Sequence, residues 1–313
     1  MSWFVFALVA TLSWGLADMF YKKSSDTEDG FSHLKIAVCV GTVMGVCALV
    51  CLAFTESIGV REFLKGMLIY SPASLSYIIS MVIGYAGMRY LEISVISPVQ
   101  NASGALSCIA MAAYFFLTGK FSSISGEFSF FDISGTAVTA LGVIMLAVVE
   151  KKEENKEITQ TDKKYKSGAL ALIFPLLYCV FDTVGTAADG IILEKKDTAG
   201  LSEMTVLSLY GITFFVFGFF AWIYLFIRTK KVYNPFAKRE RSKMTAALCE
   251  EFGQIFYVYA MAANPVIAAP MISSYCIVSV VLSRVFLGEK LTKAQYACVF
   301  TVMAGVVLLG FSE

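Results

Sequence analysis

The stretch YAGMRYLEISVISPVQNASG, residues 85–104, decides the fold. It indicates the end of one apolar helix, a very short connection and the start of the next, with only two charged residues. Pro98 lies about one turn into the second helix. Residues 257–274, YVYAMAANPVIAAPMISS, repeat this layout, and Pro270 stands 172 positions after Pro98. Two copies of one element predict an internally duplicated chain.

The composition indicates a membrane protein. Of the 313 residues, 58% are hydrophobic and only 16% are charged, and the mean hydropathy is +0.72. A soluble protein of this size needs more polar surface. Apolar runs of about 20 residues, long enough to cross a bilayer, recur along the chain. The first run lacks a basic leading segment, so we expect no cleavable signal. The net charge of +1 gives no argument for nucleic acid.

Ten membrane-spanning helices are predicted, in an all-α integral membrane fold. Their expected ranges are 3–21, 34–54, 67–88, 93–118, 131–149, 168–191, 202–227, 244–264, 265–287 and 292–311. Two connections are longer and charged: 150–166, a solvated linker, and 228–243, a basic loop.

Further matches support the duplication. LSWGLAD at 12–18 matches LLYCVFD at 176–182 with an offset of 164. GVIML at 142–146 matches GVVLL at 305–309 with an offset of 163. Small insertions in loops account for the drift of the offset. The alternative is that apolar helices resemble one another by chance, which three matches in the same order disfavour.

The matches divide the chain into a first five-helix repeat over 1–150, a charged linker over 151–166 and a second five-helix repeat over 167–313. Because five is odd, the second repeat is expected to be inverted in the membrane relative to the first. Inverted repeats with a site at their interface near the midplane are typical of secondary transporters.

The chain resembles a known superfamily. The ten short helices in two halves, SWG at 13–15 and the closing pattern FLGEKLTKAQYACVFTVMAGVVLLG at 286–310 are similar to the drug/metabolite transporter superfamily, in its EamA-like branch. The resemblance implies alternating access, with the solute bound between the two halves. The loop TGKFSSISGE at 118–127 is longer than its partner and departs from the closing pattern.

The basic residues predict an orientation. The loops after the first, third, fifth, seventh and ninth spans hold 20 of the 25 Lys and Arg residues, and the others hold five. The positive-inside rule places the first group in the cytoplasm and both termini outside. Members of the resembled superfamily are often drawn with both termini inside. We expect a multi-pass protein of the cell (plasma) membrane, an inner membrane in a bacterium.

Five carboxylates are candidates for function, because an ionisable group in hydrocarbon costs about 2.5–3.5 kcal/mol on insertion scales and tends to face a cavity or a partner. Asp18 and Asp182 are the matched pair, although helix-end positions are the alternative. Asp189, near the end of its span, is expected at the interface. Glu250 and Glu251 project about 100° apart on a helix, so at least one should face the bundle; a later helix start would leave both near the headgroups.

Aromatic and polar residues complete the candidate site. Aromatic faces beside a carboxylate form a cage for ammonium groups, and Tyr257 lies two turns after Glu250. Ordinary packing is the alternative for each aromatic, and helix–helix hydrogen bonding is the alternative for Gln100, beside Pro98. The predicted substrate-binding residues are Trp14, Asp18, Tyr85, Gln100, Tyr178, Asp182, Glu250, Glu251, Tyr257 and Tyr275.

The sequence predicts a secondary-active transporter of a small polar metabolite, a cation or zwitterion such as an amino acid, an amine or a quaternary ammonium compound, coupled to protons. One alternative is an anionic metabolite held by Arg89 and Arg284. The others are a membrane enzyme, which the single histidine, His33, disfavours, and a passive channel. The expected partners are a small molecule and the lipid bilayer. No catalytic residue, metal or cofactor is expected, and the eight cysteines are expected to be reduced.

Overall fold

The computed structural model describes residues 2–25, 29–54, 59–91, 93–158, 173–195, 201–288 and 292–311. These residues form helices and connections, with no strand among them. Six of the helices are long and apolar enough to cross a membrane, and two shorter helices are also apolar. The chain is therefore a multi-pass membrane protein.

The helices of the first half are α1 (Trp3–Ser24), α2 (Ser32–Phe54), α3 (Val60–Gly87), α4 (Ile93–Asn101), α5 (Ser103–Leu117), α6 (Ile124–Glu127) and α7 (Phe130–Ile158). Those of the second half are α9 (Ile173–Glu194), α11 (Glu203–Thr229), α12 (Arg241–Ala263), α13 (Pro265–Ser273), α14 (Tyr275–Leu282) and α15 (Lys293–Gly310), with a short 3₁₀ turn (Lys238–Glu240) before α12 and a π turn (Ser283–Leu287) after α14. Each predicted span coincides with one helix or with consecutive helical segments. The predicted start of the sixth span, at 168, lies outside the described residues.

The helix α7 is longer than predicted. It continues to Ile158, so the first eight residues of the predicted linker 151–166 are helical. Lys and Glu dominate that stretch, and both are good helix formers in water. From residue 159 onward the linker lies outside the described residues.

The spans that contain Pro98 and Pro270 are interrupted at equivalent positions. The fourth span is broken at Ala102, between α4 and α5, and the ninth at Ser274, between α13 and α14. Each break lies one turn after its proline, and the breaks are 172 positions apart. At the first, Asn101 Nδ2 donates a hydrogen bond to the Ser97 carbonyl at 2.7 Å. A side chain thus satisfies a carbonyl near the helix end, where lipid offers no partner.

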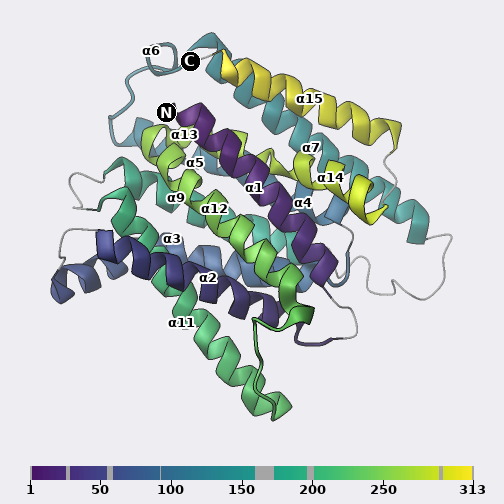
Figure 1. Cartoon of the computed structure of the whole chain (residues 1–313). Helices are drawn as coiled ribbons and strands as arrows, with labels where there is room; N and C mark the ends of the chain where they lie inside the picture. The colour runs from purple at the N-terminus through teal and green to yellow at the C-terminus, as the bar shows by residue number, and fades with distance from the viewer. Residues whose placement is uncertain are drawn as a thin grey trace.

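The two halves of the chain are interleaved. The closest helix pairs are α2 with α11, α1 with α12, α7 with α15 and α3 with α9, and each joins one helix of the first half to one of the second. The broken helices also meet, with α5 against α13 and α4 against α14. Figure 1 shows α7 beside α15 along one side of the bundle and both chain ends on the same side of the molecule. A site formed among these helices therefore draws residues from both halves.

Small residues permit the closest of these contacts, between α2 and α11. A Cβ atom on Gly41 of α2 would lie 2.6 Å from the Phe214 carbonyl oxygen. A Cβ atom on Gly211 of α11 would lie 2.4 Å from the Met44 carbonyl oxygen. Helix association in membranes relies on such close backbone packing, so both glycines are required where they stand.

Candidate functional site

A small cavity lies among α1, α3, α9, α12 and α14, and we call it the central cavity. Its lining consists of Trp14, Ala17, Asp18, Tyr21, Tyr77, Met81, Tyr178, Glu250 and Tyr275. Two carboxyl groups and five aromatic rings thus face one space. No Lys or Arg belongs to this lining among the described residues.

Glu250 of α12 is the most completely enclosed carboxyl group of the cavity, with 2% of the residue exposed. The hydroxyls of Tyr21 and Tyr85 both donate to its Oε2 atom, the second at 3.0 Å. The indole Nε1 of Trp14 donates to the Glu250 backbone carbonyl at 3.1 Å. Its Oε1 atom has no hydrogen-bond partner among the described residues. Side chains from α1 and α3 therefore fix this carboxyl group and leave one oxygen available to a ligand.

Asp18 of α1 connects the cavity to both broken helices. Its Oδ2 atom accepts hydrogen bonds from Ser97 of α4 at 2.7 Å and from Ser279 of α14 at 2.9 Å. The residue is 7% exposed. Any movement of the broken helices relative to α1 must therefore alter the contacts of this carboxyl group.

Asp182, the sequence counterpart of Asp18, is half-buried on α9 and is not part of the cavity lining. Its Oδ2 atom accepts a hydrogen bond from Ser103 of α5 at 2.6 Å. Each matched aspartate is therefore bonded by a serine in the second segment of a broken helix from the opposite half, Ser279 for Asp18 and Ser103 for Asp182.

Aromatic rings form the walls of the central cavity. The ring centroid of Trp14 lies 5.8 Å from that of Tyr275, edge to face, and 6.3 Å from that of Tyr77. The Tyr178 hydroxyl donates to the Met81 sulfur at 3.5 Å on the opposite wall. These contacts fix the rings around the two carboxyl groups.

The ten predicted site residues are only partly brought together. Those that line the central cavity are Trp14, Asp18, Tyr178, Glu250 and Tyr275. Tyr85 reaches it through its bond to Glu250. Gln100 is buried against Gly84 and Tyr178. Glu251 is not part of the lining: its side chain is hydrogen-bonded to Cys47 of α2.

Sequence reasoning did not select Tyr21, Tyr77 or Met81 for the site. A signal was present, because Trp14, Asp18 and Tyr21 are spaced at i, i+4 and i+7. Residues with that spacing share one face of a helix. On α3, Tyr77, Met81 and Tyr85 are spaced at i, i+4 and i+8, and they also share one face of their helix.

A second, smaller cavity lies beyond Tyr77, which lines both. Its lining consists of Tyr70, Ala73, Tyr77, Gly185, Asp189, Tyr210, Gln254 and Tyr257. The expectation that Asp189 lies at the membrane interface needs correction. The residue is 3% exposed, and the Tyr70 hydroxyl donates to its Oδ1 atom at 2.7 Å. Packing of α3 against α9 encloses it, which position along the sequence does not reveal.

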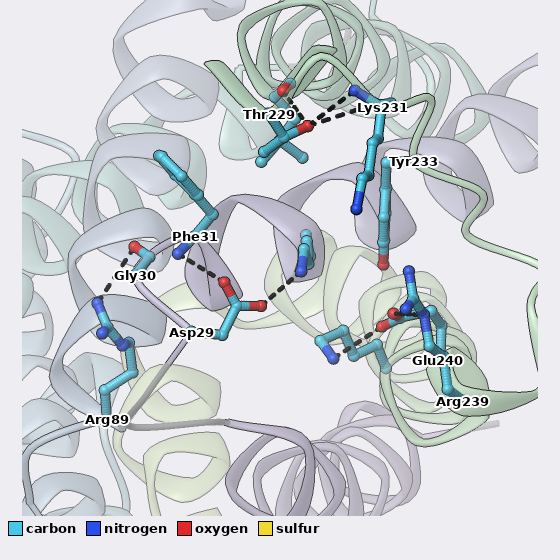
Figure 2. A network of polar contacts seen from close by, with 12 residues as sticks. Asp29, Gly30, Phe31, Arg89, Thr229, Lys231, Tyr233, Arg239 and Glu240 are labelled. Atoms are coloured by element: carbon cyan, nitrogen blue, oxygen red, sulfur yellow. Dashed lines mark hydrogen bonds and ion pairs between the residues drawn. The ribbon is translucent and has the colours of Figure 1, made fainter.

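The basic candidates lie away from both cavities. Arg89 donates to the Gly30 carbonyl at 3.3 Å within a network of loop contacts (Figure 2), and the Arg284 guanidinium lies over the Tyr296 ring. In the same network Asp29 accepts hydrogen bonds from Lys35 at 2.5 Å and from the Phe31 amide at 3.0 Å. Partial burial opposes ionisation of Asp29, but these bonds outweigh it and hold its pKa below the usual value.

The chain is similar to known membrane transporters. Residues 191–311 match the model of the EamA-like transporter family, which confirms the resemblance of the sequence to that branch of the drug/metabolite transporter superfamily. No curated protein matches the chain. A crystal structure of a protein that is 9% identical in sequence has a TM-score of 0.61, over 97% of this chain and 99% of that chain. It shows a shared fold.

Proposed function

We propose that this chain, a membrane transporter of the EamA type by its residues 191–311, carries a small organic cation or zwitterion by alternating access, with proton coupling. The observation that carries the proposal is the central cavity. Asp18 and Glu250 face a space walled by aromatic rings, and no basic residue balances them in the lining.

The chemistry of the lining favours a positively charged group. A cation over aromatic faces gains roughly 0.5–2 kcal/mol, more where water is excluded. Burying a lone charge is costly unless a partner compensates it. Glu250 offers an oxygen without a hydrogen-bond partner among the described residues, so a bound ammonium group would supply the missing partner. An amine or an amino acid meets this description through its N–H donors, and a quaternary ammonium compound is held by its charge over the aromatic faces alone.

Proton coupling follows from the same carboxyl groups. When the cation leaves, a buried carboxylate without a basic partner is stabilised by taking up a proton. A proton and the substrate cation then compete for Glu250 and Asp18. This competition supports exchange of the two across the membrane, because each departs as the other binds.

We also propose that the two halves, 1–150 and 167–313, are inverted repeats joined by the linker 151–166. The helix pairs support it. Exchanging the halves turns the pair α1–α12 into α9–α3, and it maps α2–α11 and α7–α15 onto themselves. All of these pairs are among the closest in the bundle.

Individual contacts support the same relationship. A Cβ atom on Gly142 would lie 2.4 Å from a Val302 side-chain carbon, and one on Gly305 would lie 2.5 Å from the Thr139 amide nitrogen. With the offset of 163 between the repeats, Gly142 corresponds to Gly305 and Thr139 to Val302. The contact between Gly142 and Val302 is therefore the repeat-related counterpart of the contact between Gly305 and Thr139. In transporters that work by alternating access, the binding site is near the membrane midplane, between two inverted repeats.

A thermal-stability screen of the purified full-length protein tests the proposed substrate class. The ligands are amino acids, alkylamines, quaternary ammonium salts and sugar phosphates. Binding to the folded state raises the melting temperature, and we expect this for cations or zwitterions. Glu250→Gln and Asp18→Asn should abolish the shift caused by quaternary ammonium salts, and Glu251→Gln should retain it. Stabilisation by anions alone, unchanged in these variants, would overturn the proposal and return attention to Arg89 and Arg284.

Transport itself is measured in proteoliposomes, with the best stabilising ligand as labelled solute. We expect uptake driven by a pH gradient and lost when the gradient is dissipated. If the solute accumulates regardless of the proton gradient, the proposed proton coupling is wrong, while the proposed carrier function stands. We propose a plasma-membrane location for the carrier. The excess of basic residues in the proposed cytoplasmic loops supports an orientation with both termini outside.

A further inference from the structure

We propose that the second cavity is a separate binding site that selects a primary ammonium group. The proposal deepens the carrier function, because it assigns a second position to the same class of substrate. It depends on residues that the central cavity does not use: Asp189, Tyr210 and Gln254.

The second cavity holds a carboxyl group fixed in place. Tyr70 of α3 donates to Asp189 Oδ1 at 2.7 Å, and the Oδ2 atom has no hydrogen-bond partner among the described residues. The lining contains no Lys or Arg among the described residues. A carboxylate held by a phenol and without a basic partner is suited to a cation, as Glu250 is in the central cavity.

Besides Asp189 Oδ2, two buried polar atoms of this lining have no hydrogen-bond partner among the described residues. The Tyr210 hydroxyl and Gln254 Oε1 have no hydrogen-bond partner among the described residues, and the residues are 3% and 1% exposed. A buried polar group without a partner costs about 1–3 kcal/mol. Both belong to the cavity lining, so a ligand with hydrogen-bond donors satisfies them.

The arrangement of acceptors decides which cation fits. Asp189, Gln254 and Tyr210 provide a carboxylate, an amide oxygen and a hydroxyl oxygen around one small space. A primary ammonium has three N–H donors to match them, as the lysine side chain has. A quaternary ammonium has none and would leave the polar atoms unsatisfied.

Tyr77 separates this site from the central cavity. It lines both, and its ring centroid lies 5.4 Å from that of Tyr210 on one side and 6.3 Å from that of Trp14 on the other. The two sites are also related by the repeat: Tyr85 and Tyr257 are 172 positions apart. Tyr85 donates to Glu250, and Tyr257 lines the second cavity together with Asp189. A substrate thus meets one carboxylate–tyrosine site on each side of Tyr77.

The test is calorimetric titration of the purified full-length protein with ethylammonium and, separately, tetramethylammonium. A double variant, Tyr210→Phe with Gln254→Leu, removes both unpartnered polar groups and leaves the carboxyl groups intact. Because it removes unsatisfied buried atoms, it should not destabilise the fold, and its melting temperature checks this. Glu250→Gln disables the central cavity instead.

We expect Glu250→Gln to retain one ethylammonium site and to lose tetramethylammonium binding. In the double variant, the affinity of the second site for ethylammonium should fall by about tenfold or more. The double variant should still bind tetramethylammonium in the central cavity. If Glu250→Gln abolishes ethylammonium binding altogether, or if the double variant binds it unchanged, the second site does not exist, while the proposed carrier function stands. If the unmodified protein binds neither ion, both proposals fail.

Discussion

Glu250 and Glu251 are adjacent on α12, yet their side chains have different surroundings. Glu250 lines the central cavity and is bonded by Tyr21 and Tyr85, whereas Glu251 is bonded to Cys47 of α2. Successive residues project about 100° apart on a helix, so both cannot serve one narrow site. The pair offers two variants of equal size and charge change on the same turn.

Glu250→Gln should lower the initial rate of proton-driven uptake in proteoliposomes by about tenfold or more, because a lost charge-assisted contact is worth roughly 1.5–3 kcal/mol. Glu251→Gln should stay within about twofold of the unmodified rate, since neutralising a carboxylate outside the cavity removes no ligand contact. Equal losses in both variants would show that burial of charge in α12, and not the cavity, governs transport.

The packing of α7 against α15 provides a prediction about stability. Gly142→Leu and Gly305→Leu should each destabilise the protein by about 1–3 kcal/mol, because overpacking a close contact forces side chains and backbone to move. Similar losses are expected, since each glycine faces the equivalent position of the other helix. Thermal unfolding in detergent measures them.

Gly30→Ala is the control for these variants, because nothing lies within 4 Å of a Cβ atom built there. Its melting temperature should match that of the unmodified protein. A large loss at Gly142 with none at Gly305 would argue against the exchange of contacts between the two halves.

The sequence predicted the helices far better than the site. Hydropathy is a local property, so each predicted span coincides with helical structure, including the two that contain Pro98 and Pro270. Partners across helices are not local. Tyr70 and Asp189 are 119 positions apart, and no periodicity within α3 or α9 relates them.

The spacing of residues along one helix predicts which side chains share a face, but it was applied to only part of α1. Trp14 and Asp18 were selected for the site, but Tyr21, on the same face of α1, was not. Glu251 was selected together with Glu250 because the sequence alone does not say which neighbour faces the bundle. The orientation of α12 against α1 and α2 decides it.

The loop contact of Asp29 predicts a pH dependence of stability. Its pKa is lowered in the folded protein, with the bond from Lys35 opposing the effect of burial. A lowered pKa stabilises the fold above the unfolded value, near 4, and this stabilisation disappears as the pH falls through the folded value. The difference in melting temperature between the unmodified protein and Asp29→Asn should be constant from pH 7 to about 5 and should shrink below about pH 4.

A Lys35→Met variant checks the cause. It removes the partner that holds the pKa of Asp29 down, so it should reduce the same difference at neutral pH. If Asp29→Asn and the unmodified protein remain equally far apart at pH 3, the carboxylate does not contribute to stability through ionisation.

The orientation is tested with single cysteines at exposed positions. Val232, in the basic loop after α11, and Ser122, after α5, are both exposed. With right-side-out cells and a membrane-impermeant thiol reagent, Ser122→Cys should react and Val232→Cys should react only after permeabilisation. The unmodified protein, whose cysteines are buried or half-buried, gives the background. The reverse pattern would place both termini inside.

Tyr77 predicts how the two cavities communicate. Tyr77→Ala removes the ring that lines both cavities, so the cavities should merge. Because the acceptors of the second cavity would no longer enclose the smaller ion, the preference for ethylammonium over tetramethylammonium should fall by about tenfold or more. Tyr77→Phe retains the ring and should preserve the preference, since the Tyr77 hydroxyl makes no hydrogen bond to either site among the described residues. Competition between the two ions in the uptake assay measures this ratio. A preference that survives Tyr77→Ala while melting temperatures remain comparable would show that Tyr77 does not divide the path.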